Sequence, residues 1–573
     1  MKKYPFVFGT LVFAGCPYLA FAQVDSGTLL RQNQERLDNK FPRSQEILRE
    51  FDPLAAPSTS DPNAERVLVR EFRVIGNADL SDDEIQKILA PYRGRELTIE
   101  ELNAVAFELT KAFHAAGYFA STVYLPPHLI SDGVIVLHVV SGYLQQNGIK
   151  LDNESLVKSG VIMGYLERYL KPDEVLTEAD LERALLLISD LHGVTASAEL
   201  LPGDEEGAGI LSVQAEPSKR ISGHVAFDNF GSYATGTYRG SIGIGVNSFL
   251  GIGDNLDFQY ANTGGETHFI YAGLGLSLGP SGLHAEASVS YLDYELIDRF
   301  DATRPTGSAF SLRGILSYPI VRSRQTNLRA EIDYAYSDFE DKALGAVFSK
   351  RKLNDVSFAV SGSHIDNALG GGVTTFHASG TVGDVDLSGF LPNQVIDALT
   401  VNTQGRFSKF NLGASRSQRL GGGWTAFLAV NSQIASNNLD TSQKFGLGGP
   451  FNIAGYPITE VNGDEGTYFQ ADLRHDFAEV PWGGAFQVSG GYTIGRIKLL
   501  NDPLLGFSPL TSNSFTLQSL NFGMHQSWES RFVITGLLGI QLGNSENEDP
   551  VTGADSDFST SDVRGWISAA YRF

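Results

Sequence analysis

The sequence predicts α+β domains followed by an all-β transmembrane barrel of about 16 antiparallel strands. Three observations support this fold class, and the first is that helical periodicity is present before residue 218 and absent after about Ile221. From there, segments of about ten alternating residues are separated by Gly, Asn, Asp, Ser and Pro, as in barrel strands and turns. The chain also ends on an aromatic residue inside an alternating strand. The roughly 350 residues after this point, at about 22 per strand and turn, give the strand number.

The alternating segments have one apolar face and one small or polar face. Residues 283–291 place Leu, Ala, Val and Tyr on one face, opposite His284 and Glu286. In the final strand Tyr571 and Phe573 share a face, which we interpret as the C-terminal signal of an outer-membrane barrel. Lipid requires every backbone N–H and C=O to be paired internally, and a closed barrel is the sheet that achieves this. A soluble solenoid or propeller shows similar alternation, but the sequence has no fixed repeat period.

Residues 1–22 predict a secretory signal peptide. Two lysines precede a short apolar core at residues 6–14, and Ala20-Phe21-Ala22 supplies a cleavage site. The apolar run is too short for a membrane anchor, whereas lipidation at Cys16, which follows two small residues, remains an alternative. Cys16 is the only cysteine, so the mature chain is expected to have no disulfide, which is compatible with an oxidising periplasm.

Two short segments follow the predicted leader. Residues 23–43 contain a helical pattern with too few apolar side chains to form a core, so this helix must dock on another part of the chain or stay mobile. Residues 44–65 contain several prolines and many small residues, which indicates a linker.

Residues 66–142 and 143–217 show the same β-α-α-β-β order, which predicts two tandem copies of one small α+β fold. The first unit opens with a predicted strand at 67–75. Ser81 and Thr98 then each precede a Glu by three residues, as in the capping box that begins a helix. In the second unit the first helix is predicted at residues 155–170, and strands follow at 194–201 and 210–215.

Composition and motifs argue against nucleic-acid binding and against catalysis. The net charge is −23, whereas nucleic-acid binding requires basic patches. The sequence has no metalloprotease, nucleophile-elbow or phosphate-loop motif, and its 11 histidines are scattered without ligand spacing. The Asp-rich stretch at 544–562 lacks the spacing of a calcium loop and is expected to be an exposed loop. We therefore expect no cofactor, no metal site and no enzymatic activity.

Short motifs along the chain occur in a characteristic order. They are Leu29-Leu30-Arg31-Gln32, Gly117-Tyr118, Val139-Val140-Ser141-Gly142, Leu191-His192-Gly193-Val194 and Asp228-Asn229-Phe230-Gly231. In this order they resemble the ShlB/FhaC/HecB family of outer-membrane transporters of two-partner secretion, the hemolysin secretion/activation proteins. The resemblance implies a plug helix in residues 23–43 that carries Leu29, Leu30 and Arg31. It further implies POTRA 1 at 66–142, POTRA 2 at 143–217 and the transmembrane barrel at 218–573.

A longer motif resembles the family's loop that folds back into the barrel. Its residues are Gly448, Gly449, Pro450 and Phe451, then Ala454, Gly455, Tyr456 and Pro457. In the family the residue before Gly-Tyr is usually Arg, paired with an Asp on the inner wall. Here that residue is Ala454, and the candidate wall position is Thr493. Since a lone buried charge is costly and loss of both partners is nearly neutral, we expect packing of Phe451 and Tyr456 to hold this loop.

The resemblance also implies a function and a location. It implies that POTRA domains in the periplasm recognise a secreted exoprotein through its N-terminal secretion domain, and that the barrel exports it without ATP. The implied partners also include outer-membrane lipid and the barrel-assembly machinery that inserts the chain. Two alternatives are an assembly insertase of the same superfamily and a passive porin-like channel. The exported partner, whether a haemolysin, an adhesin or another protein, is left open.

Overall fold

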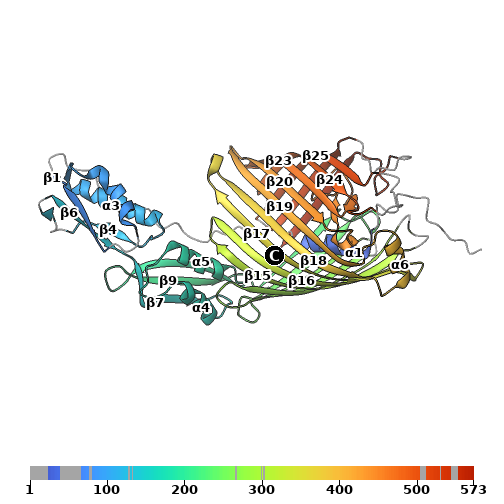
Figure 1. Cartoon of the computed structure of the whole chain (residues 1–573), viewed down its shortest axis with the longest axis horizontal. Coiled ribbons are helices and arrows are strands. Elements are labelled where there is room, and N and C mark those ends of the chain that lie inside the picture. Colours follow the sequence, from blue (N-terminus) through green and yellow to red (C-terminus); the bar gives the residue numbers. More distant parts are fainter. Residues whose placement is uncertain are drawn as a thin grey trace, which may run out of the picture.

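The computed structural model describes residues 24–38, 66–76, 80–126, 130–131, 133–264, 267–297, 300, 304–503, 512–529, 531–543 and 553–573. The predicted signal peptide at 1–22 and linker at 44–65 lie outside these residues, as does part of the Asp-rich stretch. Two small α+β units extend in a row from one end of a large barrel (Figure 1). Within the described ranges, no helix has the length and apolar character needed to cross a membrane.

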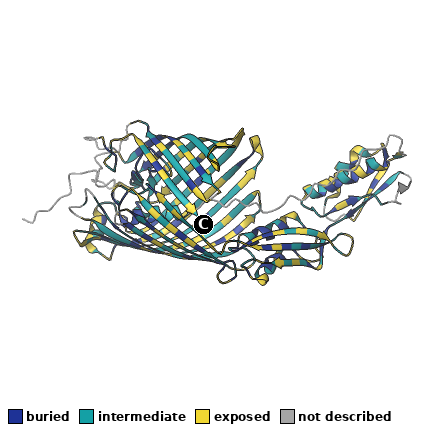
Figure 2. Cartoon of the chain, turned by 180° about the vertical axis from the view of Figure 1, so that it is seen from behind, coloured by how far each residue is buried: buried dark blue, intermediate teal, exposed yellow. Residues whose placement is uncertain are grey.

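Sixteen antiparallel strands close into one barrel, which confirms the predicted fold class. Exposed and more buried residues alternate along the barrel strands (Figure 2). In β15, for example, Phe310 and Leu312 face outward while Ser311 between them is buried. The strands are β10 Ile221–Asp228, β11 Arg239–Asn247, β12 Asn255–Thr263, β13 Thr267–Ser277, β14 His284–Glu295, β15 Thr306–Arg322, β16 Thr326–Ala343, β17 Ala346–Asp366, β18 Gly372–Asp386, β19 Gly405–Gly421, β20 Trp424–Ala435, β23 Glu465–Phe477, β24 Ala485–Lys498, β25 Ser514–Trp528, β26 Phe532–Gln541 and β27 Val563–Arg572.

The barrel closes where its last strand pairs with its first. The β27 strand pairs with β10 from His224 opposite Arg572 to Asp228 opposite Ser568. Tyr571 is an exposed side chain of this closing strand. Beyond β27, the Phe573 backbone exchanges hydrogen bonds with Gly223. Backbone pairing across this seam therefore extends from Gly223 to Asp228, and such pairing is what lipid requires.

The first α+β unit is a small sheet covered by helices. Its strands lie in the order β2-β6-β4, and β2 runs parallel to β6. Both predicted capping boxes, at Ser81 and Thr98, are present. The predicted strand at 67–75 is instead two strands, because the N–H groups of Val69 and Arg70 turn away to the carbonyls of Arg95 and Gly133. The elements are β1 Arg66–Leu68, β2 Glu71–Ile75, α2 Asp82–Leu89, η2 Ala90–Tyr92, β3 Glu96–Thr98, α3 Ile99–Ala115, β4 Thr122–Tyr124, β5 Ile130–Ser131 and β6 Val134–Val140.

The second unit repeats this arrangement with a sheet in the order β7-β9-β8. Its first helix begins at Ser159, four residues later than the sequence predicts. The reason is a local turn, in which Asn153 Oδ1 accepts from the Ser155 N–H and Asn153 Nδ2 donates to the Val157 carbonyl. Side-chain bonds of this kind compete with helix formation. The elements are β7 Tyr143–Asn153, α4 Ser159–Tyr169, α5 Glu178–Ser189, β8 Val194–Pro202 and β9 Ala208–Pro217.

The second unit is attached to the barrel at the turn between β15 and β16. Arg322 contacts Asp190 at 2.8 Å, and Arg324 contacts Glu182 at 2.8 Å. At the same junction Tyr165 of α4 is buried, and this burial raises the pKa of its hydroxyl to about 12. These contacts place the end of α5 against the barrel end that bears the two units (Figure 1).

Candidate functional site: the filled barrel lumen

Helix α1, Ser26–Asp38, lies inside the barrel (Figure 1). Its Leu29 and Leu30 are buried against side chains of the inner wall that include Phe269, Leu292 and Phe339. The helix with too few apolar residues for its own core therefore docks on the barrel. Of the two outcomes that the sequence left open, docking or mobility, the structure has docking.

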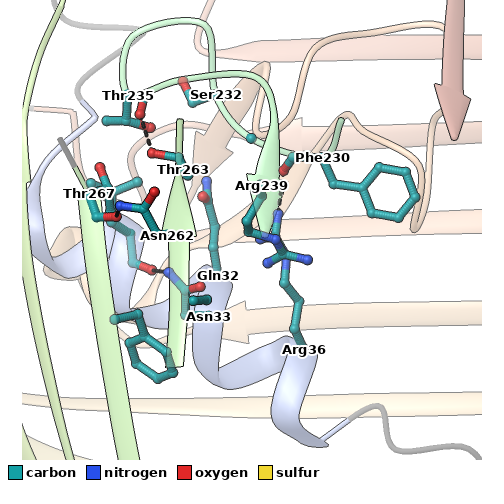
Figure 3. Close-up of a pocket in the computed structure, with 14 residues that line it drawn as sticks. Gln32, Asn33, Arg36, Phe230, Ser232, Thr235, Arg239, Asn262, Thr263 and Thr267 are labelled. Carbon is teal, nitrogen blue, oxygen red and sulfur yellow. Dashed lines mark hydrogen bonds between the residues drawn. The ribbon is translucent and has the colours of Figure 1, made fainter. Parts of the chain in front are cut away.

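Polar side chains of α1 reach the loops at one end of the barrel. Arg31 donates a 2.8 Å hydrogen bond to Asn462 Oδ1, and Gln32 donates one of 2.5 Å to Thr459 Oγ1. One turn further, Arg36 donates to the carbonyl of Phe230 at 2.6 Å (Figure 3). Beyond its first turn, the helix is thus held by a small apolar face and a set of single hydrogen bonds.

Asp25 begins this helix and was missed by sequence reasoning. Its Oδ1 accepts from the Thr28 N–H at 2.9 Å, as an N-cap residue does. An acidic residue just before a helical segment is a capping signal, so the sequence contained a clue to this role. Its second contact, to Arg351 of β17, has no signal in the sequence because the residues are 326 positions apart.

The segment that matches the family loop folds back into the barrel, as the resemblance implies. It forms a short hairpin of β21, Phe445–Leu447, and β22, Val461–Gly463. Ile453 and Tyr456 are buried in a cluster with wall residues that include Ile497 and Phe515. Two glycines make the turn possible, since Gly448 and Gly449 have φ values of +108° and +100°.

The tip of this loop presses its backbone against the last strands of the barrel. The carbonyl of Ala454 accepts a 2.8 Å hydrogen bond from Trp566 Nε1 of β27. A Cβ built on Gly455 would lie 3.1 Å from Ser519 Cβ, and one built on Gly539 would lie 2.2 Å from the carbonyl carbon of Ala454. Glycine at both positions therefore allows the two backbones to approach closely.

The wall beneath the loop tip carries a chain of neutral polar side chains. Asn521 Nδ2 donates to Thr493 Oγ1 at 2.8 Å, and Ser519 Oγ donates to Asn521 Oδ1 at 2.8 Å. All three residues are buried. Thr493 faces Ser519 across the β24–β25 pair, and Ser519 lies beneath Gly455, so the candidate wall position is near the loop tip.

Phe451 and Tyr456, the two aromatic residues expected to hold the loop, occupy different environments. Tyr456 is 1% exposed and lies in the packed cluster. Phe451 is 52% exposed and makes an edge-to-face contact with Phe230 at 5.6 Å. Arg36 of α1 lies 5.9 Å from the centre of the Phe451 ring. Tyr456 is therefore packed in the way that the sequence predicts. Phe451 instead lies outside that cluster, beside Phe230 and Arg36 of the plug helix.

Buried charges hold the two ends of the loop segment. Asp464 is fully buried and pairs with Lys444 at 2.7 Å. Glu460 is also buried, and its carboxylate accepts hydrogen bonds from the Ser556 N–H at 3.1 Å and from Ser556 Oγ at 2.5 Å. Sequence reasoning gave neither carboxylate a role.

Trp566→Phe is expected to lower the free energy of unfolding of the barrel by about 1–2 kcal/mol, because the Ala454 carbonyl loses its buried donor. The measurement is the unfolding midpoint of the detergent-purified protein, followed by its heat-modifiable migration in gels. Trp424→Phe is the matched control, since Trp424 is 43% exposed on β20. An equal change in both variants would contradict a specific contribution from Trp566.

Within the described part of the chain, no group of three or more His, Cys, Asp or Glu residues is arranged to hold a metal ion. The features of the lumen that the structure does describe are the docked helix α1, the inward loop and buried ion pairs.

Comparisons with known proteins agree with this arrangement. The family model described as haemolysin secretion/activation protein ShlB/FhaC/HecB matches residues 207–506, and the model of the ShlB-type POTRA domain matches residues 67–142. The heme/hemopexin transporter protein HuxB of Haemophilus influenzae (strain 86-028NP) is 26% identical over 539 residues, which cover 92% of this chain and 93% of HuxB. The outer membrane transporter CdiB of Escherichia coli is 25% identical over 473 residues, which cover 79% of this chain and 77% of CdiB.

Two solved structures share the fold. CdiB from Escherichia coli superposes with a TM-score of 0.71 at 20% identity and covers 95% of this chain and 98% of its own. CdiB from Acinetobacter baumannii gives a TM-score of 0.61 at 16% identity, with coverage of 96% and 97%. These findings favour the translocator over the insertase and the porin considered above. The chain therefore belongs to the ShlB/FhaC/HecB family and is a two-partner secretion transporter of the outer membrane, with POTRA domains in the periplasm and a secreted exoprotein as partner.

Proposed function

We propose that this transporter receives an unfolded partner at its POTRA domains, through the partner's N-terminal secretion domain, and passes it through the barrel lumen after α1 has left. The observation that carries the proposal is that α1 lies inside the lumen without being part of the wall. It is held by non-covalent contacts only: the apolar side chains of Leu29 and Leu30, a few single hydrogen bonds, and the ion pair of Asp25 with Arg351. A helix docked in this way shifts from a resting to an open state when a ligand, here the arriving partner, binds the open state more tightly.

The proposed export uses no chemical catalysis by the chain. The sequence contains no ATP-binding motif, so folding or binding of the exported protein outside the cell supplies the direction. Outer-membrane lipid surrounds the outward apolar side chains, and the barrel-assembly machinery inserts the chain. Among the relatives, HuxB is named a heme/hemopexin transporter protein and CdiB an outer membrane transporter. The cargo is therefore proposed only as a secreted protein with an N-terminal secretion domain.

The direct test is deletion of the gene, followed by measurement of the partner protein at the cell surface and in the medium. The candidate partner is a large secreted protein encoded by a neighbouring gene. Loss of that protein outside the cell, with recovery when the gene is restored, is the expected result. Unchanged secretion in the deletion strain would contradict the proposal.

A disulfide between the plug and the segment that leads into the inward loop is expected to reduce secretion at least about tenfold, because a tethered plug cannot leave the lumen. A Cβ built on Gly27 lies 3.1 Å from Ser442 Cβ, just below the separation of about 3.5–4.5 Å found in disulfides. The variant Gly27→Cys with Ser442→Cys is measured in a Cys16→Ser background, since Cys16 is the only cysteine in the sequence.

Addition of a reductant is expected to restore secretion by the double cysteine variant. Each single cysteine variant serves as a control for the added side chain, and its secretion is expected to be the same with and without reductant. Undiminished secretion by the oxidised double variant, with the disulfide verified by gel mobility, would show that the plug need not leave.

A further inference from the structure

One guanidinium is shared by the plug, the barrel wall and the segment that leads into the inward loop. Arg351 of β17 lies 2.5 Å from Asp25, which caps the plug helix, and 3.3 Å from Asp341 of β16. It also lies 3.0 Å from Asp440, which precedes the short helix η5, Thr441–Gln443. All four side chains are largely buried. Three carboxylates from three segments therefore surround a single cation.

Neutral groups complete this cluster around the first turn of α1. The Ser26 N–H donates to Asp341 Oδ1 at 3.2 Å, and Thr441 Oγ1 donates to Asp25 Oδ2 at 2.6 Å. A Cβ built on Gly27 would lie 3.0 Å from an Arg351 nitrogen, so glycine leaves room for the guanidinium. The first turn of the plug helix thus packs around the Arg351 guanidinium.

We propose that Arg351 is a shared positioning residue that seats the plug at rest and stays charge-balanced by Asp341 and Asp440 after the plug has left. This inference rests on the proposed function, in which α1 leaves during export. Removing one partner of a buried ion pair is strongly unfavourable when it strands the other charge. Here the departure of Asp25 leaves the guanidinium with two carboxylates, so no cation is stranded.

The arrangement also explains how a buried ion pair serves as a reversible contact. With Asp25 in place, three formal negative charges face one positive charge, so the carboxylates repel one another. That repulsion weakens the binding of Asp25 at this site, while the ion pair with Arg351 fixes the position of the first turn of α1. Since Asp440 belongs to the segment that leads into the inward loop, the same guanidinium connects the position of the plug with that of the loop.

The test is the open fraction of the purified full-length protein in planar lipid bilayers, because a barrel without its plug conducts ions. Arg351→Met is expected to raise the open fraction about tenfold, since three carboxylates then face one another without a cation. Asp25→Asn is expected to change it less than about threefold, because asparagine still caps the helix and Arg351 keeps two partners. A simple two-residue latch predicts equal effects for these two variants.

The decisive variant is Asp341→Asn with Asp440→Asn. Asparagine oxygens still accept from the Ser26 and Ser442 N–H groups, but Asp25 becomes the one carboxylate beside Arg351 within the described residues. Departure of the plug now strands the guanidinium, so the open fraction is expected to fall at least about threefold below that of the unchanged protein. If this double variant does not fold, Asp440→Asn alone is expected to change the open fraction in the same direction by less.

Folding is checked for every variant by heat-modifiable migration in gels. Arg416→Met is the matched control, since Arg416 pairs with Asp366 at the opposite end of β17 and is expected to leave the open fraction unchanged. Equal opening by Asp25→Asn and Arg351→Met, or increased opening by the Asp341 and Asp440 variant, would overturn the inference. Bilayer conductance is separate from secretion, so failure here is distinguishable from failure of the disulfide test of export.

Discussion

Ala454→Arg is expected to destabilise the folded barrel by about 3–5 kcal/mol and to remove most secretion, even though arginine is usual there in the family. Ala454 is 1% exposed, and its backbone lies against Gly539 and Trp566. The candidate wall position holds Thr493, whose hydroxyl is already bonded to Asn521. A guanidinium placed there enters a buried, neutral environment and strands a charge.

The measurement for Ala454→Arg is the unfolding midpoint in detergent, together with the amount of partner protein in the medium. Adding Thr493→Asp to the variant supplies a carboxylate and is expected to recover at least about half of the lost stability. Thr493→Asp alone is expected to destabilise by a similar amount for the same reason. Greater stability or greater secretion in the single arginine variant would refute the idea that both charges were replaced together.

Gly539→Val is expected to displace the inward loop and to reduce the free energy of unfolding by at least about 3 kcal/mol. A Cβ at this position would lie 2.2 Å from the carbonyl carbon of Ala454 and 2.4 Å from the nitrogen of Gly455. Both are backbone atoms, so a rotamer change cannot relieve the collision. The loop must move away, and the bond from Trp566 to Ala454 is lost with it.

The matched control for this variant is Gly565→Val. Gly565 lies opposite Leu538 in the same final hairpin, and a Cβ on it meets no atom within 4 Å. It is expected to leave stability within about 0.5 kcal/mol of the unchanged protein. Displacement of the loop is measured by trypsin cleavage at Lys444, which is paired with Asp464 in the structure. If both glycine variants show the same stability and the same cleavage at Lys444, the close approach of the loop to β26 is not what holds the loop in place.

The helices and strands were largely predictable because their signals are local. The alternation of side chains fixes which face of each barrel strand meets lipid. The capping boxes at Ser81 and Thr98 fix two helix starts. The errors are local as well: the strand at 67–75 divides at Val69 and Arg70, and α4 begins late because Asn153 and Ser155 form a turn.

The site was predictable only in part. The resemblance placed the loop motif and the plug helix, but not the contacts that join them. Trp566 donates to a carbonyl 112 residues away, and Arg351 meets an aspartate 326 residues away. Sequence separations of this size leave no periodic signal. Phe451, which the sequence pairs with Tyr456 as a packing residue, instead lies half exposed beside Phe230 and Arg36.

The sequence by itself determined the domain order, the closed sheet and the absence of common catalytic motifs. These could be predicted because side-chain alternation, helix caps and short motifs are each encoded within a few consecutive residues. The tertiary structure alone decided which groups share the lumen. Closure of the barrel brings β16, β17, the loop and the first turn of α1 together, so that three carboxylates meet one guanidinium. That balance of charge arises from distances in space, and these are set only when sixteen strands close into one barrel.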